Sequence, residues 1–126
     1  MRRISHAVDP EEMRCLLERP PRACIAFVNA GMAELVPVEL CFREGRYWIG
    51  LSGGESDPAP GPDQRLKLLV DAGMYYFDMH GIWIGGRAVF GEGRPEGGSP
   101  ALKWFQLVPE KFIAWDFAAM RKVKTQ

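Results

Sequence analysis

The residues of this sequence best suited to bind a charged ligand are Ser52, Arg65 and Lys67. Ser52 begins a loop rich in glycine and proline, and the two cations lie early in a helix that we predict from Asp63 to Gly73. A helix start exposes free backbone N–H groups and the positive end of the helix dipole, so a hydroxyl and an arginine beside it suit a phosphate. On this stretch alone we favour the simpler interpretation, in which Arg65 pairs with Asp63 and Lys67 is solvated.

Two elements must hold these side chains in place, one on each side of the loop. Residues 46–51 are rich in aromatic and branched side chains, which is typical of a half-buried strand. The loop 52–62 contains three prolines and three glycines and cannot form regular structure. After it, Leu66, Leu69 and Val70 recur at the spacing of one helix face. This order predicts a strand, an irregular loop and a short helix.

The first part of the chain predicts a helix and a hairpin. Asp9 and the proline after it are typical of a helix start, and a later pair of prolines would end that helix. Residues 22–29 are apolar almost throughout and residues 33–42 alternate, so we expect two strands joined by a tight turn that contains Gly31. Pro37 lacks a backbone N–H, and inside the second strand it marks a bulge, an edge or a point where another group approaches.

The second part of the chain predicts further short strands. We expect them at residues 74–80, 82–91, 104–108 and 111–117, followed by a frayed tail at 121–126. Gly81 would form the turn between the first two. Gly85 and Gly86 would permit a sharp bend or the close approach of another backbone.

These elements place the protein in the mainly β class. The pattern contains six or seven short strands, mostly joined by hairpins, and two short helices. Such strands around one core form a sandwich or a small closed barrel. An antiparallel barrel is favoured because the strands are few and several are apolar on both faces.

The charge balance limits the classes of partner. The 126 residues contain 16 Lys and Arg and 16 Asp and Glu, so the formal net charge is zero and nothing indicates a surface for nucleic acid. No apolar run approaches the roughly 20 residues needed to cross a bilayer, and the start of the chain has no secretory signal. Three widely spaced cysteines argue against a disulfide framework. We expect a single cytoplasmic domain, residues 1–126, that acts on neither nucleic acid nor membrane.

Patterns for metal binding or hydrolytic catalysis are absent from the sequence. His6 and His80 are the two histidines, no Cys or His pair has ligand spacing, and no Gly-x-Ser-x-Gly motif occurs. We therefore assign no metal site and no catalytic residue.

The four tryptophans, on four different predicted strands, are expected in the core or at a subunit interface, and one or two could instead form an apolar wall against a flat heterocycle. If the protein is an enzyme, the lack of a recognisable catalytic acid or base is typical of one whose cofactor carries the chemistry.

In their order along the chain, these features resemble the FMN-binding split β-barrel family that includes pyridoxamine 5′-phosphate oxidase. The resemblance covers about residues 10–117. It is carried by the first helix, the hairpin strand with Pro37-Val38, the strand ending in Ile49-Gly50-Leu51-Ser52, Arg65-x-x-x-Leu69, Met74–Asp78, the strand with Trp83 and Gly86, and the ending Ile113-x-Trp115-Asp116. It implies a six-stranded split β-barrel and a homodimer with FMN, or the deazaflavin F420 in some branches, at the subunit interface.

The resemblance also implies a set of cofactor-binding residues. Ser52 matches a Ser or Thr that contacts the cofactor phosphate, Arg65 matches a phosphate-binding Lys or Arg, and Lys67 is close enough to help. The segment Val36, Pro37 and Val38 matches the strand whose backbone lies along the flavin ring, and Trp83 and Trp115 match positions that line the cleft. With this resemblance, the phosphate interpretation of Arg65 becomes the favoured one.

Two departures from the family pattern leave alternatives open. Residues Gly53 to Gln64 form an insert that could displace the phosphate site or fold over it, and the region 92–103 is shorter than in many relatives. The favoured function is a flavin-dependent oxidoreductase that transfers a hydride to or from a small conjugated substrate. The alternatives are an F420-dependent reductase on the same barrel and a non-catalytic dimer that holds a flavin or haem. A small barrel that binds nucleic acid is disfavoured by the neutral charge.

Overall fold

The computed structural model describes residues 2–5, 7–53, 57–73, 79–91, 93–116 and 121–124, with side chains described from residue 8 to residue 116 within these ranges. The elements are β1 (Arg2–Ser5), β2 (Ala7–Val8), the 3-10 turn η1 (Pro10–Met13), α1 (Arg14–Glu18), β3 (Ala23–Asn29), β4 (Met32–Arg43), β5 (Arg46–Leu51), β6 (Arg65–Ala72), β7 (His80–Val89), β8 (Lys103–Asp116) and β9 (Arg121–Lys124).

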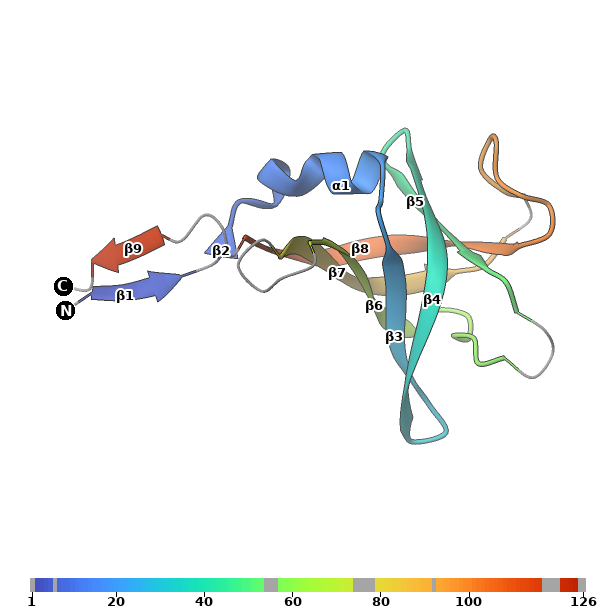
Figure 1. Ribbon diagram of the computed structural model, residues 1–126. Coiled ribbons are helices and arrows are strands. Elements are labelled where there is room, and N and C mark those ends of the chain that lie inside the picture. The colour runs from blue at the N-terminus through green and yellow to red at the C-terminus, as the bar shows by residue number, and fades with distance from the viewer. Residues whose placement is uncertain are drawn as a thin grey trace.

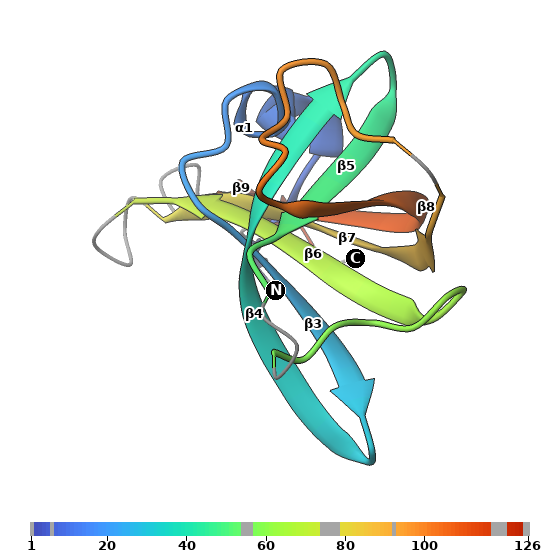
Figure 2. The ribbon, with the colours of Figure 1, turned by 90° about the vertical axis from the view of Figure 1, so that its right-hand side faces the viewer.

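Strands β3 to β8 form a closed antiparallel barrel. The hydrogen-bonded order is β8-β5-β4-β3-β6-β7, and β7 pairs back to β8, so neither end of this series is left open. β2 adds a short strand to β8 at one end (Figure 1). The twisted strands wrap around the interior of the barrel (Figure 2). This interior is apolar, and its fully buried side chains include Ile25, Ile49, Leu68, Ile84 and Phe105. The predicted mainly β barrel is confirmed.

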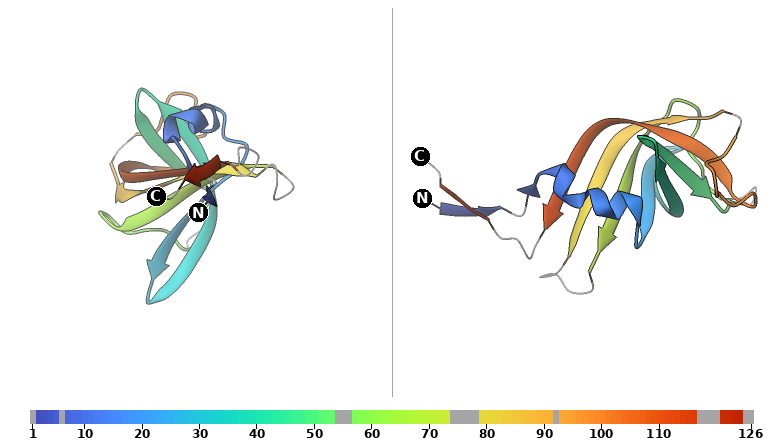
Figure 3. Two further views of the ribbon diagram at one scale, coloured as in Figure 1. Left: turned by 90° about the vertical axis from the view of Figure 1, so that its left-hand side faces the viewer. Right: turned by 90° about the horizontal axis from the view of Figure 1, so that it is seen from above.

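The predicted N-terminal helix begins as expected and is short. The Asp9 carboxylate accepts a hydrogen bond of 3.0 Å from the Glu11 N–H, and the first turn is a 3-10 turn that continues into α1. Leu16 and Leu17 are buried, and the helix packs against β4 and β6. Seen from above, α1 lies across the barrel strands as a cover (Figure 3).

Two tight turns form the hairpins that the sequence predicts. Ala30 and Gly31, between β3 and β4, have φ values of 51° and 80°, and Glu44 and Gly45, between β4 and β5, have φ values of 53° and 74°. Two consecutive residues with positive φ match the two-residue turn whose twist suits a hairpin. The hairpin predicted around Gly31 is confirmed, and Glu44 and Gly45 form a second hairpin turn of the same kind.

The predicted helix at 63–73 is wrong. Arg65–Ala72 is the strand β6, which pairs with β3 on one side and β7 on the other. Leu66, Leu68 and Val70 are buried and point inward, whereas Lys67 is exposed. The apolar residues of this segment fit both the period of two of a strand and the period of a helix. The segment forms a strand because β3 and β7 pair with it along both edges.

Several other predicted boundaries are corrected. Residues 104–108 and 111–117 were expected as separate strands, but Lys103–Asp116 is one strand, β8, so the tryptophans of these two segments share it. Gly81 is not a turn and lies buried inside β7. The predicted strand 74–80 lies outside the described residues, except for its last two positions.

Of the two alternatives predicted for Gly85 and Gly86, a sharp bend or the close approach of another backbone, the close approach is confirmed at Gly86. The register of β7 against β8 shifts by one residue between these two glycines, because β8 has one extra residue, Glu110, between the partners Pro109 and Lys111, which makes a β-bulge in β8. A Cβ atom on Gly86 would lie 2.1 Å from the Val108 carbonyl oxygen, so the backbones approach closely.

The expected frayed tail is also corrected. β9 (Arg121–Lys124) pairs with β1 (Arg2–Ser5) in a two-stranded ribbon that projects from the barrel and carries both termini (Figure 1).

Candidate functional site

Strand β4 has a free edge beside the end of β5. β4 is twice as long as β5, and β5 pairs only with Glu39–Arg43 of it. The two-residue turn makes Arg43 and Arg46 the first hydrogen-bonded pair, and such pairs alternate along antiparallel strands. The N–H and C=O groups of odd-numbered residues in β4 therefore point toward β5. At Leu35 and Pro37, beyond the end of β5, these groups point to an edge that has no partner strand among the described residues.

The position of Pro37 follows from this geometry. Its ring nitrogen carries no hydrogen, and the sequence left open whether it marks a bulge, an edge or an approach. Pro37 pairs with Cys24 of β3 across the strand, and its nitrogen faces the unpartnered side. The edge interpretation is therefore confirmed, and no hydrogen bond of the sheet is lost.

A groove of about 630 Å³ runs along this edge, and we call it the Ser52 groove. Its lining residues are Leu35, Val36, Pro37, Leu51, Ser52, Gly53, Asp57, Pro58, Ala59 and Lys103. The size lies within the range of small-molecule and cofactor sites. The groove brings together three of the residues predicted from the sequence, Val36, Pro37 and Ser52.

Lys103 is the cation among the described lining residues of the Ser52 groove, and no local sequence pattern indicates it. Lys103 is the first residue of β8 and pairs directly with Leu51, one residue before Ser52. Its Nζ lies 5.6 Å from the centre of the Phe90 ring, which is a cation–π contact. Asp57 is the only acidic residue among the described lining residues, so the charges of this lining balance. The pairing of β5 with β8 was needed to find Lys103.

Arg65, Lys67 and Trp83 lie together in a different groove, which we call the Trp83 groove. It has a volume of about 530 Å³, and its other lining residues are Ala26, Phe27, Val28, Ala33, Gln64, Leu66, Gly85, Gly86, Glu110 and Lys111. The Lys67 Nζ lies 4.9 Å from the centre of the Trp83 ring. An Arg65 Nη2 atom lies 4.0 Å from the Glu110 Oε2 atom, at the limit of an ion pair between exposed groups.

The structure thus divides the predicted site into two grooves. Arg65 lies on a strand and has no helix N-terminus beside it, and a sheet has little net dipole. The simpler pairing of Arg65 with Asp63 is also absent, because Asp63 pairs with Arg87 at 3.3 Å. Ser52 and Arg65 line different cavities.

The two remaining predicted residues line neither groove. Val38 is half-buried and packs against the core. Trp115 lies on β8 and pairs with Gly81 of β7. A Cβ atom added to Gly81 would lie 2.7 Å from the Trp115 ring, so the ring packs directly against this glycine. In both cases the side chain is held by the barrel itself.

The described part of the chain shows no cluster of three or more His, Cys, Asp or Glu side chains that could hold a metal ion. None of its helices is long and apolar enough to cross a membrane. His80 begins β7 and lines none of the grooves described above, and His6 lies outside the described residues.

Solved structures with the same architecture are known, although their sequences differ widely from this one. No protein-family model and no curated protein sequence matches the chain. An FAD-binding protein from Mycobacterium smegmatis superimposes with a TM-score of 0.63 at 11% identity, covering 90% of this chain and 96% of that one. A putative pyridoxamine 5′-phosphate oxidase from Listeria innocua gives 0.63 at 12% identity, covering 85% and 96%. An FAD-binding protein from Mesorhizobium loti gives 0.60 at 12% identity, covering 90% and 96%.

These similarities confirm the predicted fold. The chain has the split β-barrel architecture of the pyridoxamine 5′-phosphate oxidase-like proteins, and it covers nearly the whole length of each structure named above. Identities of 11–12% show the shared fold and no more.

Proposed function

We propose that the protein binds a flavin in the Ser52 groove and uses it for redox chemistry on a small conjugated substrate. The observation that carries the proposal is the unpartnered backbone edge of β4 at Leu35 and Pro37, which lines the same groove as Ser52. The names of the structures with this fold support it, since two of them are called FAD-binding proteins and the third a putative pyridoxamine 5′-phosphate oxidase.

The edge of β4 suits the ring of a flavin. The pyrimidine part of the isoalloxazine ring presents alternating hydrogen-bond donors and acceptors along one side. The free edge offers the N–H and C=O of Leu35 and the C=O of Pro37 in the same plane. A proline nitrogen adds no donor that would need a partner. Leu35 and Leu51 supply apolar walls for the flat ring system.

The end of β5 suits a phosphate. Ser52, Gly53 and Lys103 line one groove, and their hydroxyl, backbone N–H and ammonium groups are of the donor types that a phosphate requires. Arg65 and Lys67, the cations predicted from the sequence, line the other groove. In this proposal Lys103 takes the role that the sequence assigned to Arg65.

The charge of the Ser52 groove favours FMN over F420. Its described lining contains one cation, Lys103, and one carboxylate, Asp57. A single phosphate can be matched by Lys103 and neutral donors, whereas the longer acidic tail of F420 would require more basic residues. FMN is therefore the proposed cofactor, and FAD is its closest competitor because two proteins with this fold carry FAD in their names.

The protein's own groups would bind and orient more than they would transfer protons. A bound flavin supplies the hydride chemistry. Leu35, Leu51 and Pro58 would exclude water beside the ring, and the backbone edge would fix the ring's orientation. Asp57 and Lys103 are the titratable groups of the described lining, and we assign neither a catalytic role.

We further propose that two copies associate and that the flavin lies between them. The β3–β4 hairpin projects beyond the barrel (Figure 2) and exposes Val28, Met32 and Leu35 by 59%, 68% and 69%. Leu35 lines the Ser52 groove and Val28 lines the Trp83 groove, so a second copy placed on this hairpin would cover both. Apolar surface beside a cofactor groove is typical of a subunit interface.

The test is the visible absorption spectrum of the purified protein, followed by fluorescence titrations with FMN, FAD and F420. We expect FMN to bind with its fluorescence quenched. We expect Ser52→Ala to weaken FMN binding about tenfold, as for a lost hydrogen bond to a charged group, and Ser99→Ala, outside the groove, to leave it unchanged. Tight binding without turnover of any electron donor would favour a flavin carrier. Failure to bind all three compounds would overturn the flavin proposal.

A further inference from the structure

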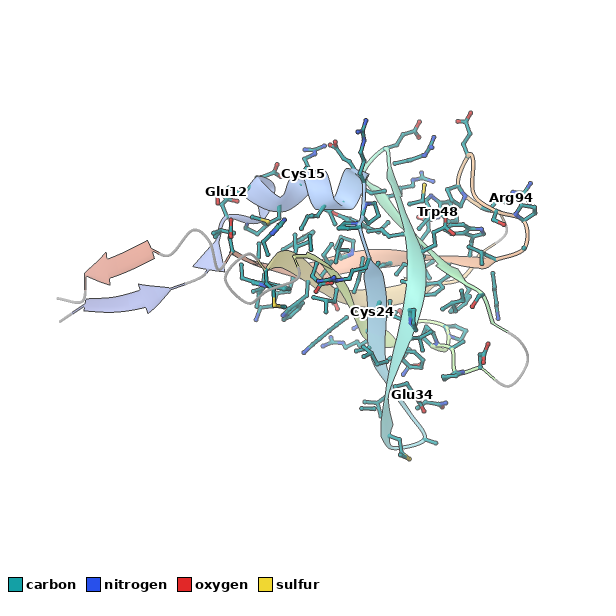
Figure 4. All side chains as sticks on the ribbon, viewed as in Figure 1. Glu12, Cys15, Cys24, Glu34, Trp48 and Arg94 are labelled. Atoms are coloured by element: carbon teal, nitrogen blue, oxygen red, sulfur yellow. The ribbon has the colours of Figure 1, made fainter. Side chains whose placement is uncertain are left out.

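A third groove lies at the far end of β5 from Ser52, and we call it the Trp48 groove. It has a volume of about 440 Å³ and is formed by the β4–β5 turn and the loop that follows β7. Arg43 and Arg46 face each other across the turn, and Trp48 lies two residues further along the same face of β5. Arg94 and Pro95 come from the loop. Figure 4 shows Trp48 on the side of β5 that faces the loop carrying Arg94.

The three arginines of this groove have no acidic partner within ion-pair distance among the described residues. Like charges placed directly opposite each other on paired strands repel, so Arg43 and Arg46 cost stability unless an anion lies between them. Glu44 and Glu96 line the same groove without forming an ion pair to any of the three. Other arginines of the barrel do have acidic partners, namely Arg14, Arg22, Arg65 and Arg87.

The guanidinium of Arg43 reaches across the groove. Its Nη2 atom lies 3.6 Å from the position that a Cβ atom would occupy on Gly97. Gly97 has a φ of +79°, a conformation that glycine adopts without strain, and it follows Pro95 and Glu96 in the loop. Arg43 therefore connects the turn to the loop and points its donors into the space between them.

Trp48 provides an aromatic surface beside these donors. Its side chain is half-buried, and in the described part of the chain no other aromatic ring and no cation is stacked on it. Its cross-strand neighbours are Cys41 and Gln106, neither of which is aromatic. A half-exposed indole next to unpaired guanidiniums suits a ligand with a flat ring and a negative charge.

We propose that the Trp48 groove binds a nucleoside phosphate, with the base stacked on Trp48 and the phosphate oxygens held by Arg43, Arg46 and Arg94. Guanidinium groups form paired hydrogen bonds to phosphate, and an indole face stacks with any base. The volume admits one small nucleotide and the chain has no net charge, so a nucleic acid polymer is not the ligand.

The nucleoside phosphate could come from two sources. It could be a free adenine nucleotide, or it could be the adenylate half of FAD. The second source rests on the proposed flavin function, whereas the first does not. The probes are therefore ADP, FAD and FMN, because ADP and FAD share the adenosine diphosphate unit and FMN lacks it.

The experiment is calorimetric titration of the full chain with ADP at low ionic strength. We expect ADP to bind, and we expect Arg43→Ala and Arg46→Ala each to weaken binding about tenfold or more, as for a lost charge-assisted hydrogen bond. Arg19→Ala is the matched control, because Arg19 is exposed, has no ion pair among the described residues and lines none of the three grooves. Trp48→Leu should weaken ADP binding without changing the binding of inorganic pyrophosphate. Because the three arginines are exposed, thermal melting should show that their variants remain folded.

The outcomes separate the sources and can overturn the proposal. If ADP still binds to the FMN-saturated protein and FAD affinity does not respond to Arg43→Ala, the ligand is a free nucleotide. If Arg43→Ala weakens FAD but not FMN, the groove holds the adenylate half of FAD. Absence of ADP binding, unchanged ADP affinity in the arginine variants, or equal affinity for pyrophosphate and ADP would contradict a nucleoside phosphate site. ADP binding in the absence of any flavin binding would support this site and refute only the flavin proposal.

Discussion

A Cβ atom on Gly86 would lie 2.1 Å from the backbone carbonyl oxygen of Val108, on the strand that closes the barrel. The same Cβ atom would lie 2.9 Å from a methyl carbon of Leu107. Both contacts occur at the β-bulge where β7 changes its register against β8. The closure of the barrel therefore depends on the absence of a side chain at this position.

Gly86→Ala should destabilise the protein by about 1–3 kcal/mol, because a backbone oxygen cannot move aside as the end of a side chain can. Urea unfolding measures this loss. Gly91→Ala is the matched control, since nothing lies within 4 Å of its Cβ position and its φ is not in the left-handed region. A Gly86→Ala variant as stable as the control would show that the bulge can relax.

Single lysine and arginine variants show whether the flavin phosphate binds in the Ser52 groove or in the Trp83 groove. Lys103→Ala should weaken FMN binding about tenfold by removing a charge-assisted hydrogen bond to the phosphate, and high salt should reduce the difference. Arg65→Ala, in the Trp83 groove, should change FMN affinity less than twofold. Fluorescence titration of both variants measures this. If Arg65→Ala weakened FMN binding and Lys103→Ala did not, Arg65 would be the phosphate-binding residue, as predicted from the sequence.

Leu35→Glu should prevent the proposed association of two copies. The substitution places a charge on the most exposed large hydrophobic side chain of the β3–β4 hairpin, next to the Ser52 groove. We expect light scattering after size exclusion to show a monomer, with weaker flavin binding. Val89→Glu introduces the same charge at an exposed apolar residue that lines neither of these two grooves, and it should remain associated. A monomeric wild-type chain would contradict the proposed dimer.

Cys24 should react slowly with alkylating agents. Burial raises the pKa of its thiol, and the nearby Asp71 carboxylate raises the pKa further. Because the thiolate is the reactive form, Cys24 should react more slowly at pH 8 than the exposed Cys15, and its rate should still increase above pH 9.0, the ordinary thiol value. Mass spectrometry of iodoacetamide-treated protein at several pH values measures both rates. Equal rates for the two cysteines would refute the raised pKa.

The same shift in Cys24 has a consequence for stability. A raised pKa in the folded state means that the unfolded chain loses this proton first as the pH rises. The contribution of Cys24 to stability is therefore full below pH 9.0 and falls as the pH rises above it. A Cys24→Ala variant should lose this dependence in urea unfolding at pH 8 and pH 10.

Local sequence was sufficient for the hairpins and for the strand before the loop. The β5 bounds of Arg46–Leu51 agree with the prediction, because strand-forming residues end there at a glycine-rich loop. Gly31 and Gly45 define turns that need positive φ. Asp9 caps its own helix. In each case the interactions that decide the structure lie within a few residues of one another in the chain.

Local sequence was not sufficient to predict that residues 65–72 form a strand. Leu66, Leu69 and Val70 satisfy the period of a helix, while Leu66, Leu68 and Val70 satisfy that of a strand. The strand forms because β3 and β7 supply hydrogen-bond partners along both of its edges, and both lie far from it in the sequence or beyond a turn. The position of Arg65 depends on this outcome.

The sequence by itself determined the mainly β fold class and the tight turns of the hairpins, because periodicity and turns are local properties. The tertiary structure decided which residues meet. It placed Ser52 beside Lys103 and the free edge of β4, placed Arg65 with Trp83, and collected three arginines around Trp48. The physical reason is that strand pairing joins residues that are distant in the chain, and no local pattern specifies which edge a strand will find.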